Sequence, residues 1–171
     1  IAVDGRPLLS NEYRVDEESL TIFNVPLSCV VSVRTRICPE KNTLLEGLYK
    51  SGSMYCTQCE AEGFRRITYY PDRPDVLSRF TTTITADAKA YPTLLSNGNV
   101  ISDQSKGGRR SVTWKDPFLK PSYLFALVAG DLAAMPDSFE TMSGRIVVLR
   151  VYSEPHNICL LYTSDAADER S

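Results

Sequence analysis

Short runs of alternating hydrophobic and polar residues, separated by turn residues, make up most of this chain. A two-residue period places alternate side chains on opposite faces of a β-strand, and threonine, valine and isoleucine favour that conformation. The clearest runs are residues 21–25, 29–37, 79–86, 111–115, 138–142 and 145–152. Because no long segment has the period of an amphipathic helix, the pattern predicts an antiparallel all-β sandwich or barrel-like domain.

Turn signals divide these runs. Asn97-Gly98 lies between apolar residues and predicts a tight hairpin, and Gly107-Gly108 and Ser143-Gly144 predict turns between later strands. Residues 39–53 show no clear period and are expected to form a loop. The apolar run 123–129 predicts a buried strand, although its length also fits part of a helix.

The densest chemistry lies in residues 56–76, which bring cysteines, carboxylates, arginines and aromatic residues together. An extended backbone over residues 58–60 would place Gln58 and Glu60 on one face, about 6–7 Å apart, with Cys59 on the other. An amide and a carboxylate side by side can hold a cationic group. We therefore take Gln58 and Glu60 as the candidate binding residues.

The other polar residues of this stretch have structural interpretations. Arg65, Asp72, Arg73 and Asp75 are expected to pin a turn through ion pairs and hydrogen bonds. Pro74 is expected to open a short helical turn that extends to residue 78.

The remaining side chains of interest are assigned to the core or the surface. Tyr69 and Tyr70 are predicted to lie in the core or an interface. Trp114 alternates with Val112 on a strand and is predicted to lie in the core. Glu62 shares the face of Gln58 and Glu60 and is expected to be a structural or surface residue.

The composition is that of one soluble globular domain, with 43% hydrophobic and 23% charged residues among 171. A net charge of −2 without a basic block gives no indication of a nucleic-acid partner. No apolar run approaches the roughly 18 residues of a membrane helix. Five irregularly spaced cysteines favour reduced thiols and a cytoplasmic protein.

The Cys56-x-x-Cys59 pair admits three interpretations. A zinc ribbon would need a second pair of ligands, and the single histidine, His156, lies far along the chain. A thioredoxin-like redox motif would precede a helix, whereas Gly63 and a β-like run follow here. We therefore favour a structural role, with metal binding or redox chemistry as the alternatives.

Specific motifs resemble a known family. The run Gln58-Cys59-Glu60-Ala61-Glu62-Gly63-Phe64-Arg65 is followed by Ile67-Thr68-Tyr69-Tyr70 and Asp72-Arg73-Pro74-Asp75-Val76. Together they resemble the N-terminal domain of the bacterial aminopeptidase N family of zinc gluzincin metallopeptidases. Further similar runs lie at residues 42–52, 95–99, 116–118 and 120–131.

The resemblance covers roughly residues 1–157 and implies a saddle-like assembly of β-sheets that precedes a catalytic domain. We expect residues 1–157 to be that N-terminal β-domain, truncated at both ends. Residues 158–171 do not resemble the family. They resemble translated sequencing-adapter read-through, and we exclude them from functional reasoning.

In that family, catalysis requires His-Glu-x-x-His and a distal glutamate that together bind zinc. This chain has neither, so the fragment alone is expected to be inactive, with zinc held by the missing catalytic domain of the intact enzyme. By the resemblance, Glu60 matches the glutamate that binds the free α-ammonium group at a peptide substrate's N-terminus. Gln58 matches the glutamine that lines the pocket for the first side chain.

The rival interpretation is a stand-alone β-sandwich binding module without catalytic activity. An epoxide-hydrolysing branch of the same family is a second alternative, although residues 72–76 resemble the aminopeptidase branch. A domain cut from a larger enzyme should expose an apolar patch of several hundred Å² and dissolve poorly by itself. A true module should be soluble and monomeric.

Overall fold

The computed structural model describes residues 1–158, and its strands pair in antiparallel fashion throughout that range. The predicted all-β class is therefore confirmed. The strands are β1 (Ala2–Val3), β2 (Arg6–Pro7), β3 (Tyr13–Val15), β4 (Leu20–Ile22), β5 (Val31–Ser32), β6 (Gly47–Ser51), β7 (Met54–Gln58), β8 (Thr81–Asp87), β9 (Thr93–Ser96), β10 (Asn99–Lys106), β11 (Arg109–Lys115), β12 (Leu127–Gly130), β13 (Ala133–Glu140) and β14 (Ile146–Ser153). Short 3-10 turns join some of them: η1 (Pro39–Lys41), η2 (Phe64–Arg66), η3 (Ser122–Leu124) and η4 (Pro155–Asn157).

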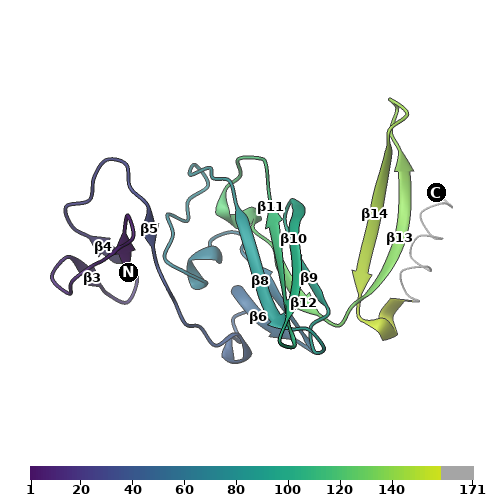
Figure 1. Ribbon diagram of the computed structural model, residues 1–171, viewed down its shortest axis with the longest axis horizontal. Helices are drawn as coiled ribbons and strands as arrows, with labels where there is room; N and C mark the ends of the chain where they lie inside the picture. The colour runs from purple at the N-terminus through teal and green to yellow at the C-terminus, as the bar shows by residue number, and fades with distance from the viewer. Residues whose placement is uncertain (159–171) are drawn as a thin grey trace.

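Two sheets form the central body of the molecule (Figure 1). One is four-stranded in the order β6-β7-β12-β9, and the other is three-stranded in the order β10-β11-β8. Ile84, Leu94, Val112 and Ala129 form a buried cluster with members from both sheets. Trp114 packs against this cluster, as predicted, and its indole Nε1 donates a hydrogen bond to the Leu94 carbonyl at 3.1 Å.

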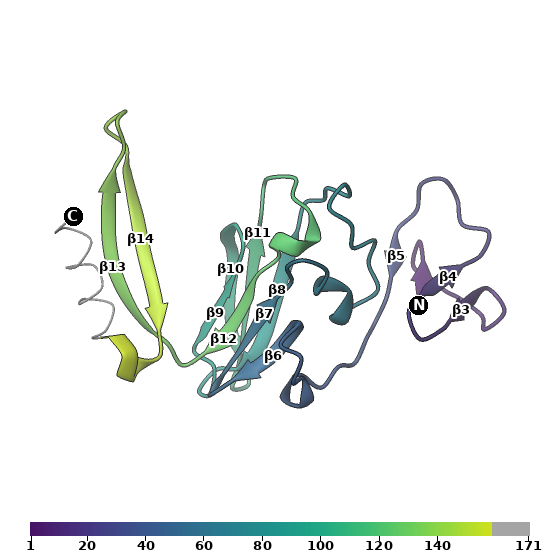
Figure 2. The ribbon, with the colours of Figure 1, turned by 180° about the vertical axis from the view of Figure 1, so that it is seen from behind.

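Smaller sheets lie at the two ends of the body (Figures 1 and 2). At the N-terminal end, β1, β2 and β5 form one sheet, and β3 pairs with β4. At the other end, β13 and β14 pair with no other described strand and stand apart from the sandwich as a long hairpin. The molecule is therefore elongated.

The predicted strands at 21–25 and 29–37 are too long. The strands found there are only β4 and β5. Val31 stays exposed, as do its neighbour Val30 and the nearby Ile37, so the alternating pattern has no packed face to stabilise a longer strand.

The predicted hairpin at Asn97-Gly98 is wrong, although a turn does occur there. β9 pairs with β12, whereas β10 pairs with β11, so the turn carries the chain from one sheet to the other. The Asn97 side chain accepts a hydrogen bond from the Ala126 N–H at 2.7 Å and donates one to the Leu124 carbonyl at 3.1 Å. These long-range partners, which a local signal cannot reveal, set the direction of the turn.

The expected loop at residues 39–53 is also wrong, because it contains η1 and the edge strand β6. β6 pairs with β7 along its whole length, and exposed polar residues such as Lys50 hide the strand pattern. The expected helical turn after Pro74 does not form. A simple turn replaces it, closed by a hydrogen bond from the Val76 N–H to the Arg73 carbonyl at 3.2 Å.

The apolar run 123–129 divides into the end of η3 and the start of β12. Strands near residues 79–86, 111–115 and 145–152 and the turns at Gly107-Gly108 and Ser143-Gly144 are confirmed. The strand predicted at 138–142 is displaced, because β13 begins at Ala133 and ends at Glu140. The prediction of a non-family tail concerns residues that, apart from Ile158, lie outside the described range. No helix within residues 1–158 has the length and apolar character needed to cross a bilayer.

Candidate functional site

Gln58 is the last residue of β7, and Glu60 lies in the turn that follows. Both residues are exposed, whereas Cys59 between them is only 2% exposed. The predicted alternation therefore holds, but the strand ends before Glu60. The Gln58 amide Nε2 donates a hydrogen bond of 3.3 Å to the Glu60 carbonyl oxygen, so it braces the backbone that carries the Glu60 carboxylate.

Gly63 allows the turn to fold directly against the end of β7. Its N–H donates to the Cys59 carbonyl at 2.8 Å. A Cβ at this position would lie 2.4 Å from the Gln58 carbonyl oxygen and 2.9 Å from the Cys59 Cα. Since real side chains do not approach backbone atoms so closely, only glycine permits this packing.

Aromatic packing anchors the residues that follow the turn. Phe64 is buried, and its ring centroid lies 5.0 Å from that of Tyr70, 5.9 Å from Phe80 and 5.1 Å from Phe125. Edge-to-face pairs of this kind stabilise one arrangement of the rings. Tyr70 is therefore half-buried in an aromatic cluster, in accord with the prediction of a core or interface position, whereas Tyr69 is 39% exposed.

Asp72 lies behind the turn with a nearly buried side chain. Its Oδ2 accepts the Arg65 backbone N–H at 2.9 Å and the Arg65 Nε at 3.3 Å, and its Oδ1 accepts the Ser122 hydroxyl. Arg73 and Asp75 form a separate exposed pair, with Nε and Oδ1 2.9 Å apart. The prediction that charged residues pin the turn is confirmed for Arg65 and Asp72, whereas Arg73 and Asp75 pair with each other within their own loop.

The two cysteines of the Cys-x-x-Cys pair differ in environment. Cys56 lies within β7, opposite Val128 of β12, and is half-buried. Burial, together with the negative charge of Asp72, raises the pKa of the Cys59 thiol to about 11. Cys59 is therefore a neutral, interior thiol at physiological pH. The described cysteines are all free: Cys29, Cys38, Cys56 and Cys59.

Within residues 1–158, no three histidine, cysteine or acidic side chains converge in a way that could hold a metal ion. His156 is exposed in η4, with its Nε2 3.7 Å from a carboxylate oxygen of Glu154. This part of the chain does not offer the donor set that a zinc centre requires.

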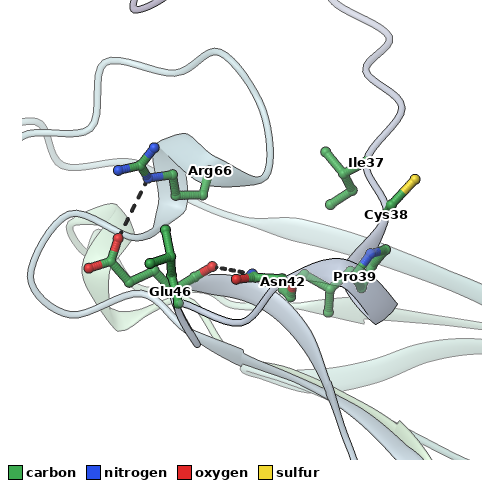
Figure 3. A pocket seen from close by; sticks show the side chains of 8 residues that line it. Ile37, Cys38, Pro39, Asn42, Glu46 and Arg66 are labelled. Atoms are coloured by element: carbon green, nitrogen blue, oxygen red, sulfur yellow. Dashed lines mark hydrogen bonds and ion pairs between the residues drawn. The ribbon is translucent and has the colours of Figure 1, made fainter.

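A pocket of about 200 Å³, which the sequence analysis did not predict, lies beside β6 (Figure 3). The Asn42 amide closes one wall by donating to the carbonyls of Glu46 at 2.7 Å and Leu48 at 3.0 Å. Arg66 and Glu46 close another, with Nε and Oε2 3.5 Å apart. The pocket lining consists of Ile37, Cys38, Pro39, Asn42, Leu44, Glu46, Leu48 and Arg66.

A second pocket of about 320 Å³ lies between the sheet of β7, β9 and β12 and residues 152–157. Neither Gln58 nor Glu60 lines either pocket. The predicted binding pair lies instead at an open strand end. The described part of the chain is thus an antiparallel β-sandwich domain with an exposed amide and an exposed carboxylate on a firmly braced turn.

Comparison with known proteins places this fold and turn in one family. Residues 6–124 match the Peptidase M1 N-terminal domain, and the chain belongs to that family. The resemblance found in the sequence is therefore confirmed.

The similar proteins are much longer than this chain. It is 59% identical over 156 residues to the aminopeptidase N of Caulobacter vibrioides, covering 91% of this chain and 18% of that protein. It is 54% identical over 147 residues to the aminopeptidase N of Escherichia coli, covering 85% and 17%. The chain therefore spans less than a fifth of the length of these two relatives.

Solved structures agree on the fold. The crystal structure of Legionella pneumophila aminopeptidase A in complex with aspartic acid matches with a TM-score of 0.83 and 38% identity, over 92% of this chain and 19% of that one. An M1 zinc metallopeptidase from Deinococcus radiodurans, bound to a Tyr-Ser-Ala substrate, matches with a TM-score of 0.69 over 90% of this chain and 36% of its own. At 16% identity, the second match supports the fold alone.

Proposed function

We propose that residues 1–157 serve as the N-terminal β-domain of a zinc-dependent aminopeptidase. In this proposal, Glu60 binds the free α-ammonium group of a peptide substrate, and Gln58 lines the site for the first side chain. Family membership and the relatives named aminopeptidase N support the enzyme class. The exposed Glu60 carboxylate on its braced turn is the observation that carries the role of this domain.

The physical chemistry suits this role. A carboxylate and an ammonium group form a charge-assisted hydrogen bond, which is stronger than a neutral one. Where such a contact becomes buried on substrate binding, removing one partner costs about 2–5 kcal/mol. If the carboxylate lies one residue's length from the site of cleavage, a substrate whose α-amine it binds presents its first peptide bond there. Cleavage is then limited to the N-terminal residue.

Zinc would have to be bound by a catalytic domain elsewhere in the intact enzyme, because residues 1–158 contain no suitable donor set. We therefore expect no peptidase activity from this domain alone. The free thiols at the described cysteines accord with a cytoplasmic enzyme.

Exposed apolar side chains favour a larger enzyme over a stand-alone module. On β14, Ile146 is 69% exposed and Val148 66%, and Phe139 on β13 is 59% exposed. Exposed apolar residues clustered on one hairpin indicate a surface that packs against something else. A soluble monomeric module would not need such a surface.

The gene itself provides the first test. Reading it past the codon for Asn157 should reveal the His-Glu-x-x-His motif and the distal glutamate. A stop codon soon after Asn157 would contradict the enzyme and favour the binding module.

The role of Glu60 is tested in the full-length enzyme that carries this domain. The Glu60→Gln variant should lose kcat/KM by about 30-fold or more while retaining its zinc, since a contact worth about 2–5 kcal/mol is lost. Glu17→Gln is the control for loss of an exposed carboxylate, because Glu17 lies in the turn between β3 and β4, outside the Glu60 turn. Unchanged kinetics in Glu60→Gln would contradict the proposed role.

A further inference from the structure

We propose that Asp72 is a positioning residue for Glu60. It fixes the turn that presents the Glu60 carboxylate and does not contact substrate itself. This inference rests on the proposed function of Glu60, and it adds the group that holds the binding carboxylate in place.

Both carboxylate oxygens of Asp72 are engaged by protein groups. The side chain of Asp72 is only 3% exposed. Its Oδ2 accepts the backbone N–H of Arg65 at 2.9 Å, and its Oδ1 accepts the hydroxyl of Ser122. The Arg65 guanidinium adds Nε to Oδ2 at 3.3 Å and Nη2 to the Asp72 carbonyl at 2.7 Å. A buried carboxylate is tolerated only with such partners, so this geometry is closely defined.

The first link runs from Asp72 to the Glu60 turn. The turn is fixed at its beginning by the hydrogen bond from the Gly63 N–H to the Cys59 carbonyl at 2.8 Å. It is fixed at its end where Asp72 holds the Arg65 N–H. Glu60 lies between these two attachment points. Releasing the second would leave the end of the turn held by the packing of Phe64, without a hydrogen bond to fix the Arg65 backbone.

The second link runs from Asp72 to the sheet. Ser122 belongs to η3, which leads into β12, and β12 pairs directly with β7. The Leu127 N–H of β12 also donates to the Thr57 hydroxyl of β7 at 2.9 Å. Asp72 therefore completes a closed circuit of contacts. The circuit runs from β7 through the turn to Asp72, from Asp72 to Ser122, and through β12 back to β7.

A closed circuit of this kind preorganises the binding carboxylate. A substrate amine that meets a fixed carboxylate need not order it on binding, which improves affinity. Loosening the circuit should therefore weaken recognition of the α-amine more than it slows the chemical step.

The experiment uses the full-length enzyme that carries this domain and two probes. One probe is an amino-acid hydroxamate, and the other is the same hydroxamate without its α-amino group. Calorimetry gives the Kd of each probe, and the Kd of the probe without the amine is divided by the Kd of the probe with it. This ratio reports amine recognition separately from overall integrity of the site. We expect Asp72→Asn to reduce this ratio about fivefold or more, and to raise KM for an amino-acid anilide with kcat within about twofold of wild type.

Two further variants sharpen the test. Ser122→Ala removes one of the Asp72 contacts and keeps the charge, so it should shift the ratio in the same direction by a smaller factor. Asp75→Asn removes an exposed carboxylate from the same loop, where Asp75 pairs with Arg73, and should leave the ratio unchanged.

The outcomes separate this inference from the proposed function. A folded Asp72→Asn enzyme with the wild-type ratio would overturn the positioning role, provided that Glu60→Gln abolishes the preference for the amine. If Glu60→Gln also keeps the wild-type ratio, the proposed function itself fails. Should Asp72→Asn not fold, Ser122→Ala decides: a wild-type ratio there contradicts the positioning role, and a reduced ratio supports it.

Discussion

At the scale of single residues, the buried Cys59 lies directly between the two exposed candidate binding residues. Its neighbours Gln58 and Glu60 are exposed, but its thiol is buried beside the negative charge of Asp72, and its pKa is raised to about 11. The folded protein therefore keeps this proton at a pH where the unfolded chain, with a thiol pKa near 9, loses it. The resulting stability is fully present below about pH 9 and is lost as the pH rises towards 11.

We predict that raising the pH from 8 to 11 lowers the free energy of unfolding by about 2–3 kcal/mol more in the wild type than in Cys59→Ala. Urea unfolding at both pH values measures the difference, and the tyrosines and lysines that titrate in the same range are common to both proteins. Cys38→Ala, at an exposed thiol, should behave like the wild type. Equal losses in the wild type and Cys59→Ala would refute the prediction.

The sequence pattern predicted which side chains around Glu60 are exposed, but not the contacts that hold their turn. The two-residue period placed Gln58, Cys59 and Glu60 on the correct sides, because exposure alternates locally. The partners of Asp72 could not be predicted, since Ser122 lies 50 residues away in the sequence and a hydroxyl carries no distinctive signal.

At the scale of elements, local signals located turns but not the strands that they join. Asn97-Gly98 has the composition of a hairpin turn, yet the strands on its two sides belong to different sheets. β6 was missed because edge strands carry many polar residues. Strand existence follows from local pattern, whereas pairing follows from packing across the sandwich.

Gly98 and Gly107 both have a positive φ, but only Gly98 is closely packed, so the pair separates the effect of local conformation from that of packing. Gly98 has φ +89° and a Cβ there would lie 2.2 Å from the Lys115 carbonyl oxygen, whereas Gly107 has φ +58° and no atom within 4 Å of such a Cβ. We predict that Gly98→Ala lowers the free energy of unfolding by about 3–5 kcal/mol, from strain and overpacking together. Gly107→Ala should lose only about 1–2 kcal/mol, from strain alone. Chemical denaturation compares them, and equal losses would show that the corner at Gly98 is not tightly packed.

At the scale of the whole molecule, the β13–β14 hairpin is the clearest departure from a compact domain. It pairs with no other strand in the described structure, and apolar residues are exposed at alternating and at intervening positions of β14, such as Val148 and Leu149. The sequence pattern predicted two strands here, because alternation is visible locally. It did not predict that the hairpin would stand apart from the sandwich.

We predict that this chain, expressed alone, associates through the hairpin. Replacing Ile146 and Val148 by lysine should shift the protein towards monomer, since both side chains are more than 60% exposed and lie on one face. Size-exclusion chromatography with light scattering measures the change. Lysine at Thr81 and Thr83, two exposed positions on β8, adds the same charge elsewhere and should change little. A wild-type chain that is already monomeric would contradict the prediction.

The pairing of β7 with β12 also sets the order in which the site can form during synthesis. Thr57 of β7 and Leu127 of β12 are 70 residues apart in the sequence, and Asp72 and Ser122 are 50 apart. Such long-range contacts close large loops and form slowly. A nascent chain that stops before Ser122 already carries Gln58 and Glu60 but lacks the strand that holds their turn. The ribosome must therefore release Ser122 and β12, as well as residues 58–60, before the contacts that hold this turn can form.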